Sequence, residues 1–173
     1  MPNYSKAGKI MIPLTPEQFI KGMEEGKFAR EKHRGLAALL YYTGIRISEG
    51  LRAKKEQFTL YENRINFEVG KRLKRGATTP PLIISLNNIY ASQIWEAAEE
   101  TKKKERVWPY CRSTGYNIIS RVWSYPHHLR LTRITDLFSK GFTVPEVKTY
   151  TGLTLPALDF YIGVVAIEKM AEE

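Results

Sequence analysis

The chain has 173 residues, of which 43% are hydrophobic, so it can bury a core and does not have the composition of a disordered protein. Its 27 Lys and Arg residues outnumber 18 Asp and Glu residues, and the net charge of +9 favours a polyanionic partner. Cys111 is the one cysteine, which excludes an intrachain disulfide. Neither a signal-peptide pattern nor an apolar run of about 18 residues is present. These features predict a cytoplasmic protein, in a host cell or associated with its nucleoid, with no membrane partner.

The first third of the chain predicts a polar arm followed by helices. Residues 1–14 form the arm, and Thr15-Pro16 has the N-cap and first-position residues of a helix start. Between Arg34 and Lys55 apolar residues recur at helical spacing, and Thr43-Gly44 interrupts them. The pattern therefore predicts two helices with a sharp joint.

The middle of the chain changes to a strand pattern. Residues 64–69 alternate between polar and apolar side chains, residues 70–76 are a basic turn, and residues 82–86 read as a returning strand. We expect a β-hairpin or a small sheet with a cationic tip.

The remainder predicts helices in one domain over residues 15–173, because no linker-like segment divides it. The first of these helices is expected to start at Asn87 or Asn88 and to reach Thr101. The others are expected over residues 113–123, 126–140 with Gly141 as the stop, 144–151 with Gly152 as the stop, and 155 or 156 to 170. The expected fold class is mainly α with a small antiparallel β-sheet.

Two short segments and one tyrosine carry the strongest functional signal. Residues 39–49 read Leu-Leu-Tyr-Tyr-Thr-Gly-Ile-Arg-Ile-Ser-Glu, and residues 127–132 read His-His-Leu-Arg-Leu-Thr. Tyr161 follows Arg130 by 31 residues. These segments resemble the two boxes of the tyrosine recombinases, or phage-type integrases, in which the boxes read Thr-Gly-hydrophobe-Arg-x-Ser-Glu and His-x-Leu-Arg-x-Thr. The resemblance runs from about residue 36 to residue 167 and implies a DNA breaking-rejoining fold.

The resemblance implies a role for each of five residues. Arg46 and Arg130 would hold the non-bridging oxygens of the scissile phosphate, for which a planar guanidinium is suited. Tyr161 would attack the phosphorus and form a 3′-phosphotyrosine intermediate. Lys71, on the hairpin, would protonate the leaving 5′ oxygen, and His127 would exchange protons near neutral pH. This chemistry needs no metal and no cofactor.

Several assignments have named rivals in the sequence. Lys74 competes with Lys71, because the basic turn allows a slip of register. Tyr150 competes with Tyr161, and His128 competes with His127, although the box places its histidine three residues before the arginine. Glu49 is expected to orient Arg46 or the helix joint rather than to take part in the chemistry.

The chain departs from the family pattern at two places. Relatives carry a histidine or tryptophan after a Leu-Gly pair between the second box and the tyrosine, whereas this chain has Leu153, with Thr154 as a weak substitute donor. The spacing from Gly152 to Tyr161 is about one residue shorter than usual. Relatives have an amino-terminal core-binding domain, whereas only about 30 residues precede the first box region here, so the chain is expected to be either a stand-alone catalytic domain or a fragment of a longer protein.

The leading hypothesis is a site-specific DNA recombinase or integrase, of the kind used in viral genome integration. It would act on double-stranded DNA and self-associate as a tetramer. The alternatives are a catalytically weak or inactive DNA-binding relative, motivated by Leu153, and relaxation like that of a type IB topoisomerase. A basic helical protein that binds RNA is a third alternative.

Overall fold

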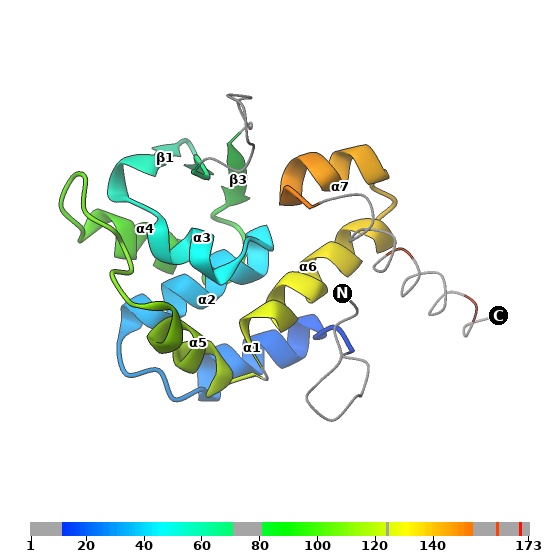
Figure 1. The fold of residues 1–173 in the computed structure, drawn as a ribbon, viewed down its shortest axis with the longest axis horizontal. Helices are drawn as coiled ribbons and strands as arrows, with labels where there is room; N and C mark the ends of the chain where they lie inside the picture. Colours follow the sequence, from blue (N-terminus) through cyan, green and yellow to red (C-terminus); the bar gives the residue numbers. More distant parts are fainter. Residues whose placement is uncertain (1–11, 71–80, 124, 154–161, 163–169, 171–173) are drawn as a thin grey trace.

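The structure is a computed structural model, and it describes residues 12–70, 81–123 and 125–153 together with residues 162 and 170. Figure 1 shows α2 in the middle of the molecule, between the strands with α4 on one side and α6 on the other. The elements follow in the order α1 (Pro16–Glu25), α2 (Glu31–Thr43), α3 (Ile47–Arg52), the 3-10 turn η1 (Lys55–Gln57), β1 (Phe58–Tyr61), β2 (Arg64–Phe67), β3 (Leu82–Ser85), α4 (Ala91–Glu99), α5 (Arg112–Ser120), α6 (Pro126–Ser139) and α7 (Val144–Thr151).

The first three helices follow the sequence prediction. The Thr15 hydroxyl accepts a hydrogen bond from the Gln18 N–H at 3.2 Å, and Pro16 opens α1. Gly44 ends α2 with a left-handed φ of 65°, and α3 begins three residues later. The predicted joint between two helices is therefore confirmed.

The three strands form an antiparallel sheet in the order β1-β2-β3, and the predicted hairpin is β2–β3. Its buried face, which packs on α2 and α4, consists of Phe58, Ile65, Phe67, Leu82 and Ile84. Strand β1 was not expected from the sequence. It is an edge strand of four residues in which only Phe58 is buried.

The predicted start of α4 at Asn87 or Asn88 is wrong. The helix begins at Ala91, after Tyr90 in a left-handed conformation with no side-chain cap. The Asn87 side-chain oxygen instead accepts a hydrogen bond from Asn63 Nδ2 at 2.7 Å. This bond joins the turn before β2 to the loop after β3, so the Asn87 side chain does not cap the helix. The Asn88 carbonyl accepts from the Ala91 N–H in a turn that precedes the helix.

The later helices agree better with the sequence. Helix α6 ends at Ser139 and is followed by Gly141 with φ 86°, and α7 ends at Thr151 before Gly152 with φ 67°. Helix α5 ends at Ser120, earlier than predicted, because Trp123 lies in a turn and stacks on Phe19 of α1. The basic turn over residues 71–76 and most of the predicted last helix lie outside the described residues.

The apolar interior forms two clusters. The larger surrounds α2, most of whose side chains are buried, and includes Trp108 and the buried face of the sheet. The smaller, here called the α6–α7 cluster, consists of Leu131, Ile134, Leu137, Phe138, Val147 and Leu153. None of the helices in the described ranges combines the length and apolar character that a membrane span requires.

Candidate active site

The first corner of the chain, residues 43–45, delivers Arg46 to the surface. Thr43 Oγ1 donates to the Leu39 carbonyl at 2.5 Å, which keeps the hydroxyl satisfied inside the core. The following Gly44 takes the left-handed conformation that reverses the chain, and the next N–H donates back to the threonine hydroxyl at 3.4 Å. Arg46 then occupies the N-cap position of α3.

Glu49 fixes the start of α3, as the sequence predicted. Its Oε2 accepts a hydrogen bond from the Arg46 backbone N–H at 2.7 Å, and its Oε1 lies 3.8 Å from Arg46 Nη1. The Glu49 side chain is 9% exposed, whereas that of Arg46 is 50% exposed. The carboxylate is therefore committed to the joint, and the arginine is open to an anionic ligand.

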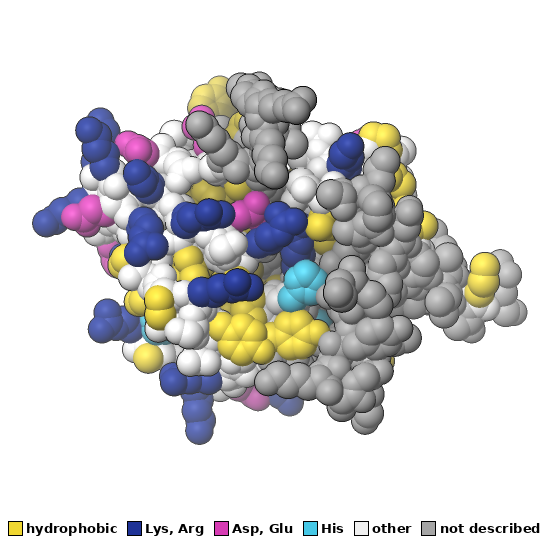
Figure 2. All heavy atoms as spheres, in the orientation of Figure 1, with side chains coloured by type: hydrophobic (Ala, Val, Ile, Leu, Met, Phe, Trp, Pro, Cys, Tyr) yellow, Lys and Arg dark blue, Asp and Glu magenta, His cyan; other side chains and the backbone are white. Residues whose placement is uncertain are grey.

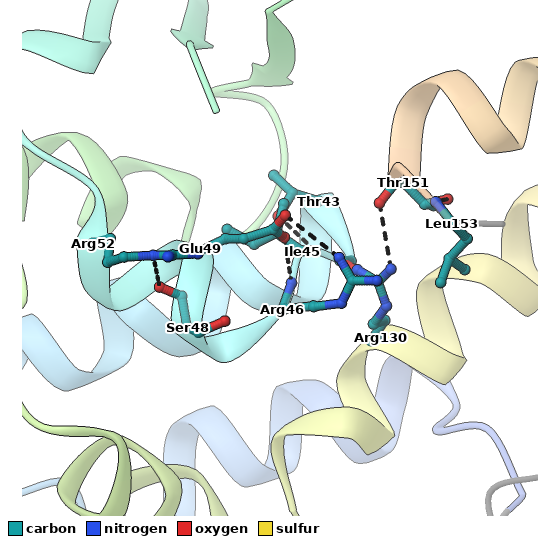
Figure 3. Close-up of polar contacts among 10 residues, drawn as sticks. Thr43, Ile45, Arg46, Ser48, Glu49, Arg52, Arg130, Thr151 and Leu153 are labelled. Carbon is teal, nitrogen blue, oxygen red and sulfur yellow. Dashed lines mark hydrogen bonds and ion pairs between the residues drawn. The ribbon is translucent and has the colours of Figure 1, made fainter. Parts of the chain in front are cut away.

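The second corner, residues 151–153, is joined to the first by Arg130 of α6. Arg130 is only 1% exposed, and its Nη1 donates to the Gly44 carbonyl at 2.6 Å while its Nη2 donates to the Thr151 carbonyl at 3.3 Å. These carbonyls lie at the C-terminal ends of α2 and α7, where a positive charge is favourable. Figure 3 shows the Arg130 side chain between the two corners, with Arg46 and Glu49 beside the first.

His127 lies one helical turn before Arg130 and shares its surroundings. Burial, followed by the positive charges of Arg130 and Arg46, lowers the pKa of His127 to about 4. The imidazole is therefore neutral near pH 7 and able to accept a proton. A bound phosphate would offset the two arginine charges and raise this pKa.

His128 has a different environment. Its side chain is buried, and its Nε2 is 2.6 Å from the carbonyl oxygen of Ile12, in the segment before α1. Of the two histidines in the second box, His127 lines the pocket described next and His128 does not.

A pocket of about 300 Å³ brings these groups together. It lies between the first corner, α5 and the start of α6, and it is lined by Ile45, Arg46, Ile47, Ser48, Arg112, Tyr116, Tyr125, Pro126, His127 and Arg130. Figure 2 shows Lys and Arg side chains over α3 and α5 on this face, with a histidine and hydrophobic side chains among them. Such a combination of a concave shape and positive charge suits a phosphodiester.

The sequence analysis did not identify Arg112, Tyr116 and Tyr125 as pocket residues. Arg112 and Tyr116 are four residues apart on α5, so they project from one face of that helix. Many pairs in the chain have this spacing, and only the packing of α5 beside α3 and α6 distinguishes them.

Other sequence candidates have different positions. Tyr150 donates its hydroxyl to the Tyr42 carbonyl at 2.9 Å and lines another cavity, between β3, α6 and α7. Leu153 is 8% exposed and packs in the α6–α7 cluster. Lys71, Lys74, Thr154 and Tyr161 lie outside the described residues. Within the described part of the chain, no three His, Cys, Asp or Glu side chains are close enough to hold a metal ion.

Known proteins resemble this chain in sequence and in fold. No family model matches the chain. It is 28% identical over 160 residues to TnP I resolvase of Bacillus thuringiensis, which covers 82% of this chain and 52% of the resolvase. Its structure resembles that of the XerH site-specific recombinase bound to palindromic difH substrate in a post-cleavage complex. The TM-score is 0.70 and the sequence identity 18%, and the match covers 98% of this chain and 55% of XerH.

A second solved structure, of the XerA recombinase, has a TM-score of 0.68 and 16% identity over 98% of this chain and 68% of XerA. The chain thus spans about half the length of the resolvase and of XerH. The predicted fold class, mainly α with a small antiparallel sheet, is confirmed. The chain has the catalytic-domain fold of the tyrosine recombinases, whose two boxes its sequence resembles.

Proposed function

We propose that this chain is the catalytic domain of a tyrosine-type site-specific recombinase that cleaves and rejoins double-stranded DNA. The observation that carries the proposal is the shared pocket of Arg46, His127 and Arg130 on a basic face. Arg46 lies more than 80 positions before His127 and Arg130, and each of the two segments that contain them resembles a box of the same family. The XerH relative was solved with its DNA substrate, which supports a DNA ligand for this pocket.

In the proposed reaction the scissile phosphate enters the pocket, and Arg46 binds its non-bridging oxygens. Arg130 adds positive charge beneath it while holding the two corners in place. The Tyr161 oxygen attacks phosphorus, the bond from phosphorus to the 5′ oxygen breaks, and a 3′-phosphotyrosine remains. The arginines oppose the negative charge that grows in the transition state, which is where such contacts accelerate a reaction.

Proton transfer in the proposed reaction involves the two remaining residues. Lys71 gives a proton to the departing 5′ oxygen, and neutral His127 can take the proton of the Tyr161 hydroxyl. Religation is the reverse of this sequence, so the bond energy is stored in the phosphotyrosine and neither a metal nor a cofactor takes part. Arg112 lies at the rim of the same pocket and is placed to bind a neighbouring phosphate.

A pool of duplexes nicked near randomised sites tests this proposal, because loss of the short product strand traps the covalent adduct. We expect a protein–DNA adduct on a denaturing gel, and none from Tyr161→Phe. Tyr150→Phe is the matched control, since it removes a hydroxyl whose partner is a backbone carbonyl. An adduct that persists in Tyr161→Phe, or its absence from the wild type, contradicts the proposal.

The choice between Lys71 and Lys74 has its own test. A substrate with sulfur in place of the leaving 5′ oxygen needs no general acid, because a thiol is far more acidic than an alcohol. Lys71→Ala should lose adduct formation on the normal substrate and regain it on the sulfur substrate. Lys74→Ala should change neither. The reverse pattern would assign the acid to Lys74.

One observation favours a second candidate, a DNA-binding relative that does not cleave. Leu153 replaces a polar residue of the family pattern and is buried in an apolar cluster, so it supplies no hydrogen-bond donor to a phosphate. This candidate predicts salt-dependent DNA binding without any adduct. Should adducts form, recombinant products between paired sites would indicate the proposed tetrameric recombinase, whereas plasmid relaxation alone would indicate topoisomerase-like activity.

A further inference from the structure

The segment just before α1, residues 12–14, crosses α6 and is here called the strap. Two hydrogen bonds hold it there. His128 Nε2 donates to the Ile12 carbonyl at 2.6 Å, and the Leu14 N–H donates to Thr132 Oγ1 at 2.9 Å. His128 and Thr132 are four residues apart, so both bonds come from one side of α6. The Thr132 hydroxyl in turn donates to the His128 carbonyl at 2.8 Å.

The bond from His128 has a defined direction and a cost. Because its acceptor is a carbonyl, Nε2 must carry the proton. The ring is buried, and its Nδ1 has no hydrogen-bond partner among the described residues. A buried nitrogen of this kind destabilises the fold unless other contacts compensate. An apolar side chain would avoid that cost, but it could not hold the strap.

The first turn of α6 depends on such tertiary contacts. Pro126 occupies its first helical position, but the N-cap residue, Tyr125, makes no side-chain cap hydrogen bond, so side-chain capping does not secure the first turn. The other end of the strap is fixed, because Thr15 forms a capping box with Gln18 and Phe19 of α1 stacks on Tyr41 of α2 at 3.6 Å. The strap is thus anchored between the helical core and the turn that carries His127.

We propose that His128 is a positioning residue, which acts through the strap to hold the first turn of α6 and so places His127 and Arg130 at the pocket. Consecutive helical residues project about 100° apart, which lets one histidine face the pocket while its neighbour grips the strap. The catalytic part of this inference rests on the proposed function, and the structural part does not.

Three variants test it. His128→Gln keeps an N–H donor for the Ile12 carbonyl, His128→Ala removes it, and His33→Ala is the matched control. His33 is also a buried helical histidine with a single hydrogen bond, to the Tyr110 hydroxyl at 3.2 Å, and it does not line the pocket. The measurements are hydrogen exchange of the α6 amides, DNA affinity, and the single-turnover rate of adduct formation on the nicked pool.

We expect His128→Ala to speed amide exchange in the first turn of α6 and to slow adduct formation about tenfold, with DNA affinity within about twofold of wild type. His128→Gln should restore both exchange and rate to within about threefold. His33→Ala should lower thermal stability without these effects. The inference is overturned if His128→Gln behaves like His128→Ala, if His33→Ala slows the reaction as much, or if exchange in α6 is unchanged.

The exchange measurement separates this inference from the proposed function. If the wild type forms no adduct, the proposed function fails, and faster exchange in His128→Ala would still support the strap as the holder of α6. If adducts form and exchange does not change, the strap inference fails and the proposed function stands.

Discussion

The first corner, residues 43–45, and the second corner, residues 151–153, have the same backbone structure and opposite surroundings. In both, a buried threonine hydroxyl donates to the carbonyl four residues earlier, a glycine turns the chain at φ 65° or 67°, and the following N–H donates back to the threonine. Each corner ends on a buried apolar side chain, Ile45 in the first and Leu153 in the second. Ile45 lines the pocket and is followed by Arg46, which is half exposed there, whereas Leu153 packs in the α6–α7 cluster.

The comparison teaches that the corner is a backbone device and that its surroundings decide its use, a pocket at Ile45 and an apolar cluster at Leu153. A carbonyl from each corner accepts a hydrogen bond from Arg130, so the two reversals are held at a fixed separation. The first corner leads into Arg46 at the pocket, and the second ends on Leu153 in the α6–α7 cluster.

Loss of Arg130 should have the largest effect, because it removes the link between the corners. Arg130→Ala leaves two buried carbonyls without their donor, which should lower the free energy of unfolding by about 2–5 kcal/mol. It should also abolish adduct formation. Arg130→Lys retains the charge, but its single ammonium group cannot reach both carbonyls as the two guanidinium nitrogens do. This variant should therefore recover part of the stability and little activity. Chemical denaturation and the nicked-substrate assay measure the two effects, and a fully active Arg130→Lys would refute the bridging role.

Substitution of Arg46 and of Leu153 should separate activity from stability. Arg46→Ala should slow adduct formation by about 10²–10³-fold and change stability by less than about 1 kcal/mol, because its pair with Glu49 is long and half exposed. Leu153→Ala should lose about 2–4 kcal/mol of stability and keep its rate within about threefold well below the unfolding temperature. Arg64→Ala, at an exposed arginine of β2 outside the pocket, is the control for charge.

A large rate loss in Leu153→Ala would instead mean that the second corner belongs to the active site. That result would contradict the division of roles between the corners, in which Leu153 serves the core and not the reaction.

Much of the fold could be predicted because its signals are local. The Thr15-Pro16 helix start, the Thr43-Gly44 joint and the stop at Gly152 depend on capping and on positive φ, which neighbouring residues decide. The start of α4 could not be predicted in the same way. The Asn87 side chain accepts a hydrogen bond from Asn63, which is 24 positions earlier in the chain. Rules based on neighbouring residues do not predict such a contact.

The site shows the same division. Arg46, His127 and Arg130 were found because two boxes contain them, and the structure brings the three to one pocket. Arg112 and Tyr116 were missed because nothing near them in the sequence marks them, and they reach the pocket only through the packing of α5. The burial of Arg130 was also not foreseen, because its partners are backbone carbonyls 86 and 21 positions away.

Alanine at the turning glycines should show smaller, graded effects. Each glycine has a positive φ, which costs an alanine about 1–2 kcal/mol. At Gly44 a new Cβ would also lie 3.1 Å from the Cβ and Cγ of Arg133, whereas at Gly141 it would meet nothing within 4 Å. Gly44→Ala should therefore be less stable than Gly141→Ala, and it alone should slow adduct formation, because it disturbs the carbonyl that Arg130 binds. Equal effects of the two variants would show that the first corner tolerates a shift.

The smallest effect should be on the pKa of His127, which depends on Arg46 beside the first corner and not on Leu153 of the second. Its pKa of about 4 reflects burial first and the charges of Arg130 and Arg46 next. Arg46→Ala removes one of these charges, so the pKa should rise, while Leu153→Ala should leave it unchanged. The ring-proton shifts of His127 in NMR spectra, identified with a His127→Gln variant, measure this pKa.

Since the unfolded chain takes up this proton near the ordinary pKa of 6.5 and the folded chain only near 4, His127 should destabilise the fold progressively as pH falls through that interval. Above pH 6.5 the group should have no effect on stability, and in Arg46→Ala the interval should be narrower. If the pKa of His127 changes in Leu153→Ala and not in Arg46→Ala, the assignment of Arg46 as one of its determinants is contradicted.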